Sequence, residues 1–255
     1  MFGKRFSIKS FFRNFSKKFL GKNFWKNYFK VYDVLNESYS YQTLLKKVVQ
    51  EAQLDADQQV LDAGCGTGNL IPLLQKNRIE YIGIDIIPEA LEIAQKKIFS
   101  ENIKIEFGDI SKKSKFQSNT FDRIISINVF YILSDKGRES ALKEFHRILK
   151  PGGKLIIATL KKGFDPKKIY IETLRIGRKK LGLLKSLIKA FGLILPTIKM
   201  LFYNQIINNK QKKGAYKYFS REEIKDLLSK NGFKEVKSKL VYAGQGILVS
   251  GIVDK

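Results

Sequence analysis

Short apolar runs rich in β-branched residues alternate with helix-like stretches between residues 58 and 160. This alternation is typical of βαβ units that build a parallel sheet. The expected strands are Val60–Ala63, Tyr81–Asp85, Ile103–Phe107, Arg123–Asn128 and Lys154–Thr159, separated by a helix that begins near Asn69 and by the helices Pro88–Ser100 and Gly137–Leu149. The pattern therefore predicts an α/β core built on a doubly wound sheet.

Residues 218–255 predict one helix and two strands. Ser220 and Glu223 have the spacing of the N-cap and N3 residues of a capping box, and the helix that they open is expected to stop at Asn231-Gly232. Phe233–Val241 and Ile247–Val253 then follow as strands. We expect this segment to complete the core.

Two segments outside the core carry apolar stripes at helical spacing. The stripe of residues 1–20 comprises Ile8, Phe11, Phe12, Phe15 and Phe19, and that of the later segment comprises Leu183, Leu184, Leu187, Ile188 and Phe191. Pro196 is expected to break or kink the later segment, after which Ile198, Leu201, Phe202 and Ile206 form another stripe. We therefore divide the chain into N-terminal amphipathic helices (1–57), a core (58–160), a helical lid (161–217) and a C-terminal helix with two strands (218–255).

Charge separates these additions from the core. The chain has 255 residues, with 48 basic and 24 acidic side chains and a net charge of +24. Residues 31–160 contain 17 basic and 17 acidic residues, whereas residues 1–30 contain 9 and 0 and residues 161–217 contain 15 and 2. The excess therefore belongs to the additions, where it suits an anionic partner such as a membrane surface or a nucleic acid.

The remaining composition predicts an intracellular protein without a metal site. Cys65 is the single cysteine, which excludes an intrachain disulfide and a cysteine-based zinc cluster. Basic residues interrupt the N-terminal apolar stretch and the run from Leu181 to Ile207, so we expect neither a secretory signal nor a membrane span. His146, the only histidine, is expected to have a surface or helix-packing role and not to act in catalysis.

The strongest chemical signal is the segment Asp62-Ala63-Gly64-Cys65-Gly66-Thr67-Gly68-Asn69, at the first expected strand-to-helix turn. Glycines let a backbone turn tightly and approach a ligand, and the following helix N-terminus presents N–H groups. The dinucleotide fingerprint requires a glycine where this chain has Asn69, which argues against NAD. Asp85 ends the next strand 21 positions after Gly64, where a carboxylate can accept both hydroxyls of a ribose.

Together with four later blocks, this turn resembles the motifs of class I S-adenosylmethionine-dependent methyltransferases. The later blocks follow in the family's order: Tyr81–Ile86, Phe107–Ile110, Phe121–Ile125 and Arg147–Gly153. The resemblance covers residues 58–160 and, more loosely, residues 218–253. It implies a Rossmann-like sheet of seven strands whose last strand is antiparallel, and S-adenosyl-L-methionine as the cofactor.

The resemblance also implies a set of site residues. Asp62 would orient the glycine turn and the methionine ammonium, Asp85 the ribose, and Asp109 the adenine amino group. The full cofactor-binding set is Asp62, Gly64, Cys65, Gly66, Gly68, Asp85, Ile86, Asp109, Ile110 and Asn128. We assign no catalytic base, since methyl transfer can proceed by positioning and exclusion of water, and Tyr131 is a candidate substrate contact.

Basic amphipathic helices on both sides of such a core predict a hydrophobic or lipid-like acceptor, of quinone, phospholipid or isoprenoid type, methylated at an anionic membrane surface. The protein would then be cytoplasmic, with a peripheral membrane association. Three alternatives stay open: an RNA methyltransferase (tRNA or rRNA) that uses the basic segments to bind phosphates, a plain structural cap over the pocket, and a binding subunit without activity.

Overall fold

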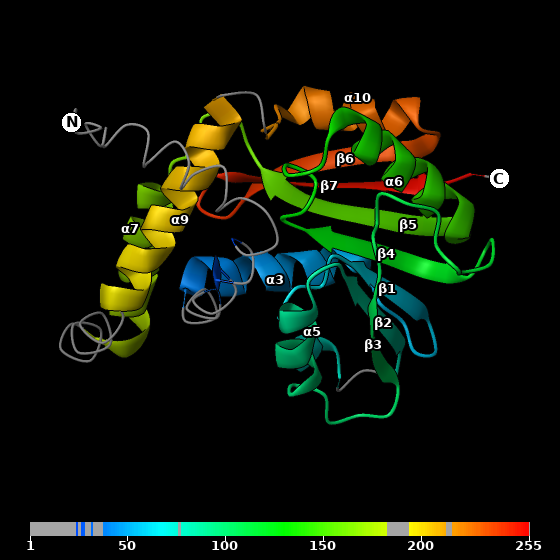
Figure 1. Cartoon of the computed structure of the whole chain (residues 1–255), viewed down its shortest axis with the longest axis horizontal. Helices are drawn as coiled ribbons and strands as arrows, with labels where there is room; N and C mark the ends of the chain where they lie inside the picture. Colours follow the sequence, from blue (N-terminus) through cyan, green and yellow to red (C-terminus); the bar gives the residue numbers. More distant parts are fainter. Residues whose placement is uncertain are drawn as a thin grey trace, which may run out of the picture.

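The structure is a computed structural model, and it describes residues 24, 27–28, 32, 38–75, 78–182, 194–212 and 216–254. The stripes predicted for residues 1–20 and for 183–191 lie outside the described residues. Element labels follow Figure 1.

The described residues form a sheet of seven strands in the order β3-β2-β1-β4-β5-β7-β6 (Figure 1). The strands are β1 (Gln59–Ala63), β2 (Glu80–Asp85), β3 (Ile103–Phe107), β4 (Phe121–Ile127), β5 (Leu149–Leu160), β6 (Phe233–Val241) and β7 (Gly246–Val253). Strands β1 to β5 pair in parallel, whereas β7 runs antiparallel to both β5 and β6. The predicted fold class, with its antiparallel last strand, is confirmed.

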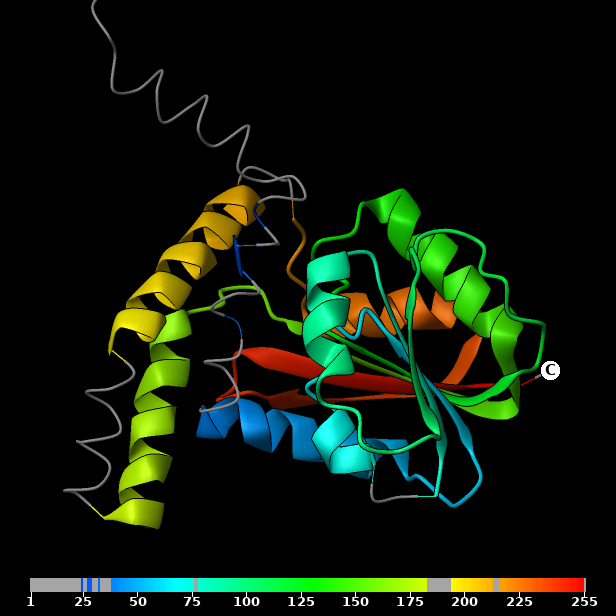
Figure 2. The same ribbon diagram turned by 60° about the horizontal axis from the view of Figure 1, so that its bottom comes forward.

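Helices cover both faces of this sheet (Figures 1 and 2). One face carries α3 (Tyr39–Ala52), α4 (Ile71–Leu74) and α5 (Pro88–Gln95), and the other carries α6 (Asp135–Ile148) and α10 (Arg221–Lys230). Neighbouring strand residues alternate between the two cores: Ile125 and Ile156 face α3, while Ile124 and Leu155 face α6. Successive residues of a strand point to opposite faces of the sheet, and in the central strands both sets are apolar because helices cover both faces.

Most predicted elements appear within a few residues of their expected bounds. The capping box of α10 forms as predicted, since the Ser220 hydroxyl accepts from the Glu223 N–H and the Glu223 carboxylate accepts from the Ser220 N–H. Helix α5 ends at Gln95 and not at Ser100. The Lys97 N–H donates to the Ala94 carbonyl, three residues earlier and not four, so the α-helical hydrogen-bond pattern stops there.

The predicted lid contains two described helices, α7 (Pro166–Leu181) and α9 (Ile194–Lys212). They lie at one end of the molecule, beyond the carboxyl ends of the parallel strands (Figures 1 and 2). Helix α7 packs on α3, where a Cβ added to Gly177 would lie 3.2 Å from the Tyr39 ring. No helix among the described residues is long and apolar enough to cross a bilayer.

Helix α9 begins at Ile194, so Pro196 lies in its first turn, where no backbone donor is needed. The break predicted at Pro196 concerns the junction with residues 183–193, which lie outside the described residues. Of the stripe predicted on α9, Ile198 and Phe202 are exposed, and Leu201 and Ile206 are half-buried. The side of α9 that packs on the molecule carries Ile207, which is buried, and Tyr203, whose ring contacts Phe24 and Tyr28. The partner of this helix is the N-terminal segment, which periodicity alone could not identify.

Candidate active site

A cavity of about 310 Å³ opens at the carboxyl ends of β1, β2 and β4. This is the position at which open parallel sheets bind ligands, and the volume is in the range of small-molecule pockets. Nine of the ten predicted cofactor-binding residues line the cavity, as does Tyr131, and Gly68 does not. Its other lining residues are Tyr28, Tyr32, Tyr41, Leu45, Asn69, Leu70, Ile87, Gly108, Ser111, Ile127, Val129, Ile132 and Leu133.

The glycine turn between β1 and α4 forms the floor of the cavity. Gly64 has a φ of +85°, and a Cβ at this position would lie 2.4 Å from a methyl carbon of Val129. The N–H groups of Gly64 and Cys65 both donate to the Ile84 carbonyl, which ties the turn to β2. Gly68 faces away from the cavity and permits close packing instead, since an added Cβ would lie 2.6 Å from Ile71 and 2.9 Å from Ala94.

Asp85 stands at the end of β2 with its carboxylate fixed by the backbone. One oxygen accepts from the Gly66 N–H at 2.9 Å and the other from the Ile87 N–H at 2.9 Å. Each carboxylate oxygen has a further lone pair for a ligand hydroxyl. The side chain is deeply buried, and this burial raises its pKa although the two N–H donors oppose the shift.

Asp62 lies at the end of β1, deeper in the same cavity. Its carboxylate accepts from the Tyr81 hydroxyl at 2.6 Å. Burial raises the pKa of Asp62 to about 7; the Tyr81 hydrogen bond opposes this rise, and the neighbouring Asp85 adds to it. A cationic group bound beside it would therefore bind the ionised form more tightly.

Asp109 and two isoleucines lie on the opposite side of the cavity. The Asp109 carboxylate accepts from the N–H and the hydroxyl of Ser111, at 3.0 and 2.6 Å. Partial burial raises the pKa of Asp109, but the Ser111 hydrogen bonds and the Lys112 ammonium outweigh it and leave the pKa below its ordinary value. Ile86 is 48% exposed and Ile110 is 8% exposed, so both can cover a flat ring.

The segment after β4 brings Asn128 and Tyr131 to the cavity, and backbone and side-chain hydrogen bonds hold this segment in place. Asn128 has a φ of +58°, a rare value for a residue other than glycine, and its N–H donates to the Ala158 carbonyl. The buried Arg138 guanidinium then donates to the Phe130 and Leu133 carbonyls and, at 2.5 Å, to Asp135.

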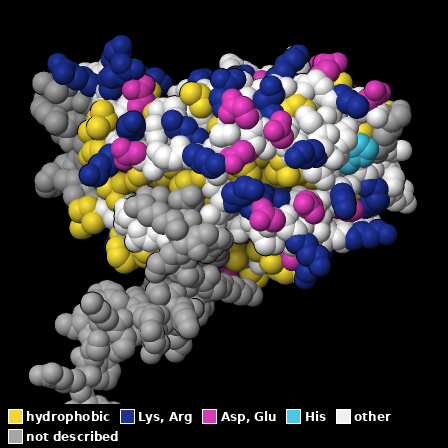
Figure 3. All heavy atoms as spheres, turned by 90° about the horizontal axis from the view of Figure 1, so that it is seen from above, with side chains coloured by type: hydrophobic (Ala, Val, Ile, Leu, Met, Phe, Trp, Pro, Cys, Tyr) yellow, Lys and Arg dark blue, Asp and Glu magenta, His cyan; other side chains and the backbone are white. Residues whose placement is uncertain are grey.

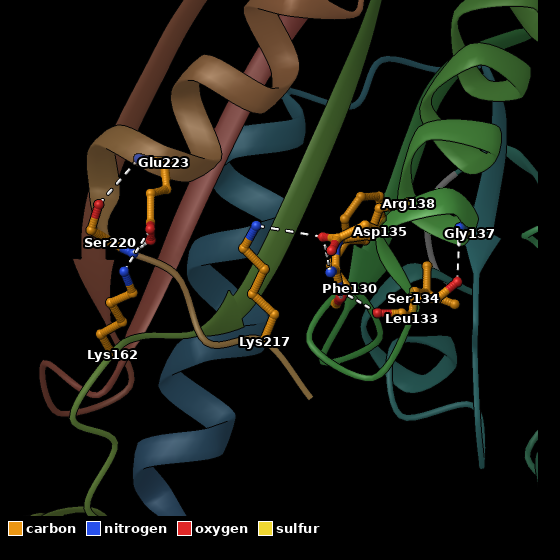
Figure 4. Close-up of polar contacts among 10 residues, drawn as sticks. All are labelled: Phe130, Leu133, Ser134, Asp135, Gly137, Arg138, Lys162, Lys217, Ser220 and Glu223. Atoms are coloured by element: carbon orange, nitrogen blue, oxygen red, sulfur yellow. Dashed lines mark hydrogen bonds and ion pairs between the residues drawn. The ribbon is translucent and has the colours of Figure 1, made fainter. Parts of the chain in front are cut away.

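Arg138 and Asp135 thus form a brace for the loop, and Lys217, the last residue of the lid segment, contacts it. The Lys217 ammonium lies 3.5 Å from Asp135 (Figure 4), and the Lys217 N–H donates to the Tyr131 carbonyl. The Arg138 guanidinium also lies 5.4 Å from the centre of the Phe219 ring. The end of the lid segment and the loop of Tyr131 are therefore one connected unit.

Sequence reasoning missed a wall of tyrosines at one side of the cavity. Tyr28, Tyr32 and Tyr41 line it together with Tyr131, and a second layer packs behind them: Tyr203, Tyr216, Tyr218 and Tyr242. The Tyr32 and Tyr41 hydroxyls are 3.2 Å apart. The available signal was that 9 of the 11 tyrosines lie outside the matched core (58–160), although no spacing rule brings those positions together.

His146 has the packing role predicted for it, with its ring 5.6 Å from that of Phe233. No group of three or more metal-ligating side chains occurs in the part of the chain that the structure describes.

A model of the methyltransferase domain matches residues 60–153. An uncharacterized methyltransferase of Oceanobacillus iheyensis is 31% identical over 177 residues, which are 67% of this chain and 78% of that protein. This chain is a class I S-adenosylmethionine-dependent methyltransferase. A demethylmenaquinone methyltransferase of Lactobacillus johnsonii is 27% identical over 88% of each chain. The methyltransferase solved in complex with the Haloferax volcanii Trm112 activator shares the fold, with a TM-score of 0.64, 15% identity and coverage of 91% of this chain and 98% of that one.

The methyltransferase uses S-adenosylmethionine, as its family does, and the side chains around the cavity fit that cofactor. Asp85 offers two anchored carboxylate oxygens for a ribose, Ile86 and Ile110 offer apolar surface for an adenine, and Asp62 offers an anion for the ammonium. The individual role of each residue in the methyltransferase remains a prediction that binding measurements can test.

Proposed function

We propose that this methyltransferase methylates a hydrophobic or lipid-like small molecule, of quinone, phospholipid or isoprenoid type. The observation that carries the proposal is the composition of the cavity beyond the cofactor residues. Apart from Asn69, Gly108 and Ser111, the described lining residues there are tyrosines and aliphatic side chains, and none of them is a lysine, arginine or histidine. A phosphate-rich acceptor such as RNA would call for cations near the reacting atom.

The tyrosines also suggest how the acceptor would be held. Burial is the main cause that raises the pKa values of Tyr28, Tyr32 and Tyr131 well above their ordinary value, so these phenols are neutral hydrogen-bond donors near pH 7. Aromatic walls with neutral donors suit a flat apolar molecule that bears oxygen atoms. A quinone-type acceptor has this character, and the similarity to a demethylmenaquinone methyltransferase supports it.

Methyl transfer from a sulfonium is an in-line displacement, in which the acceptor atom forms a bond to the methyl carbon as the carbon–sulfur bond breaks. The chain would contribute by orienting the acceptor and by excluding water. Tyr131 would touch the acceptor, and the Arg138 brace would fix the loop that carries it. No side chain is assigned as a general base.

The test is a transfer assay with methyl-labelled S-adenosylmethionine on separate total lipid and total RNA extracts. The proposal predicts label in the lipid fraction with the wild-type protein, and background label with Asp85→Ala as the cofactor-site control. Label in RNA alone would replace this proposal with the nucleic-acid alternative.

We also propose that the enzyme acts at a membrane surface, because acceptors of this class partition into bilayers. Such an acceptor has to reach the cavity from the lipid phase. Helices α7 and α9, if they lie in the membrane interface, would place the cavity beside the lipid. The cytoplasmic location, with a peripheral attachment, is part of the same proposal.

A further inference from the structure

Exposed apolar side chains are concentrated on the two lid helices. Among the described residues, 11 large hydrophobic side chains are exposed, and 7 of them lie on α7 or α9. They are Tyr170, Ile171, Leu174 and Leu181 on α7, and Leu195, Ile198 and Phe202 on α9. Contiguous exposed apolar surface of this kind marks an interaction site, whereas isolated exposed residues need no explanation.

On α7 the exposed apolar side chains form a stripe along the helix. At 3.6 residues per turn, its four exposed hydrophobic residues fall within about 100° of the helix circumference. Ile171 is 63% exposed, while Ile169, on the opposite side of the helix, is buried, and Gly177, beside the edge of the stripe, is buried against α3. Helix α7 therefore has apolar residues on the side that packs against the protein and a second apolar stripe on its outer face.

Helix α9 has the same organisation. Leu195, Ile198 and Phe202 are 71%, 57% and 58% exposed, and they fall within about 60° of the circumference. The neighbouring Tyr203 points to the protein side, where its ring lies 5.8 Å from that of Tyr28 in the cavity wall. The outer stripe of α9 is thus next in sequence to a side chain that packs against the cavity wall.

The charged residues of these two helices are almost all basic. Helices α7 and α9 together contain nine basic residues and one acidic residue, Glu172, which is paired with Arg175 at 2.9 Å. Lys167 and Arg178 lie within the α7 stripe, and Lys168 and Lys179 lie on the neighbouring face, roughly 60–80° beyond its edge. Seen from above, hydrophobic and basic side chains stand next to one another at this end of the molecule (Figure 3).

We infer that the outer faces of α7 and α9 form a docking surface for an anionic phospholipid bilayer. Apolar side chains would enter the interface while the lysines and arginines contact anionic headgroups, which is the binding mode of interfacial amphipathic helices. The surface lies at the cavity end of the molecule, so docking would present the tyrosine-lined wall to the lipid phase. This inference rests on the proposed function for its purpose, but its test does not depend on the acceptor.

The test is cosedimentation of the full-length protein with large vesicles at low salt. One vesicle preparation contains only phosphatidylcholine, and the other contains phosphatidylcholine with about a third phosphatidylglycerol. Because each basic residue near an anionic surface adds favourable free energy, we expect binding at least tenfold tighter to the anionic vesicles and a marked loss at high salt. Full-length protein that stays in the supernatant with anionic vesicles, or that binds only tRNA in a parallel arm, would overturn the inference.

Variants locate the surface. The quadruple variant Ile171→Gln, Leu195→Gln, Ile198→Gln and Phe202→Gln keeps the charge and the helix propensity, and should bind anionic vesicles at least tenfold more weakly. The matched control is Phe99→Gln, which removes an 84% exposed aromatic just before β3 at the amino ends of the strands, and should bind as the wild type does. Unchanged binding of the quadruple variant, or an equal loss in the control, would show that α7 and α9 are not the docking surface.

A transfer assay separates this inference from the proposed function. With total lipid extract dispersed in nonionic detergent, the quadruple variant should transfer methyl groups at the wild-type rate, and with the same lipids in vesicles it should be at least tenfold slower. Vesicle binding without any labelled lipid would overturn the proposed function and leave the docking surface standing. Equal loss in detergent and in vesicles would overturn the docking role.

Discussion

Asp85 occupies the position with the most constrained geometry in the cavity, since both carboxylate oxygens are held by backbone N–H groups. We predict that Asp85→Ala weakens S-adenosylmethionine binding by about 2 kcal/mol, or roughly 30-fold, through the loss of charge-assisted hydrogen bonds. Titration calorimetry measures this directly. The matched control Asp57→Ala removes an exposed carboxylate and should leave the affinity unchanged. An unchanged affinity in Asp85→Ala would refute its assignment to the ribose.

Asp62 makes cofactor binding dependent on pH. With its pKa raised to about 7 by burial, Asp62 in the free protein is largely protonated at pH 6. The cofactor's ammonium favours the carboxylate, so binding at pH 6 should release a proton, and affinity should rise from pH 6 to pH 7.5, a range in which an amino group is still largely protonated. Calorimetry at pH 6 in two buffers of different ionisation enthalpy measures the released proton. Equal heats in both buffers would contradict the role of Asp62, and Asp62→Asn should abolish the buffer dependence.

At the scale of elements, the segment between β4 and α6 depends on one buried side chain. We predict that Arg138→Ala lowers the free energy of unfolding by about 2 kcal/mol, because the Phe130 and Leu133 carbonyls lose their donor in a buried place. It should also raise the KM for the acceptor more than it raises the Kd for S-adenosylmethionine. Urea unfolding and steady-state kinetics measure the two effects.

Arg175→Ala provides the control for this change. Arg175 pairs with Glu172 three residues away, as Arg138 pairs with Asp135, but its side chain is 66% exposed. Exposed pairs contribute little, so the expected change in stability is below about 1 kcal/mol. If Arg138→Ala were equally mild, or if it impaired cofactor and acceptor binding to the same extent, the loop would not depend on this brace.

The elements of the core could be predicted from sequence because their signals are local. Alternating apolar runs, the glycine turn and the Ser220–Glu223 capping box each act within a few residues, and each was found at its predicted place. The buried face of α9 could not be predicted, because it is set by contacts between Tyr203 and the distant Phe24 and Tyr28. Periodicity shows that a helix has an apolar side and not which neighbour covers it.

At the scale of the whole molecule, the cavity is completed by segments far apart in sequence. Tyr28 from the N-terminal segment and Tyr203 from α9 pack on each other at its wall, with ring centres 5.8 Å apart. This separation in sequence explains why the residues of the motif turns could be placed at the cavity from sequence and the tyrosine wall could not. The spacing of the motifs predicts the turns that follow β1, β2 and β3. The tyrosine wall depends instead on how the segments outside the core, residues 1–57 and 161–217, pack on the core.

This organisation predicts that a substitution in the tyrosine wall impairs acceptor binding without impairing cofactor binding. Tyr28→Ala should lower kcat/KM for the acceptor by about tenfold or more, because a buried aromatic wall residue is lost, while the Kd for S-adenosylmethionine should change less than twofold. Transfer kinetics in detergent and calorimetry measure the two quantities. Tyr170→Ala, on the exposed face of α7, should change neither in detergent. A large rise in the cofactor Kd for Tyr28→Ala would show that the tyrosine wall belongs to the cofactor half.

The central claim is that one cavity holds the cofactor beside a tyrosine-lined acceptor chamber. A crystal structure of the protein with S-adenosylhomocysteine tests it most directly. The account predicts ribose hydroxyls within hydrogen-bonding distance of the Asp85 carboxylate, the adenine between Ile86 and Ile110, and the sulfur facing Tyr131. A ligand whose ribose lies away from Asp85, or whose sulfur faces away from the tyrosines, would contradict it.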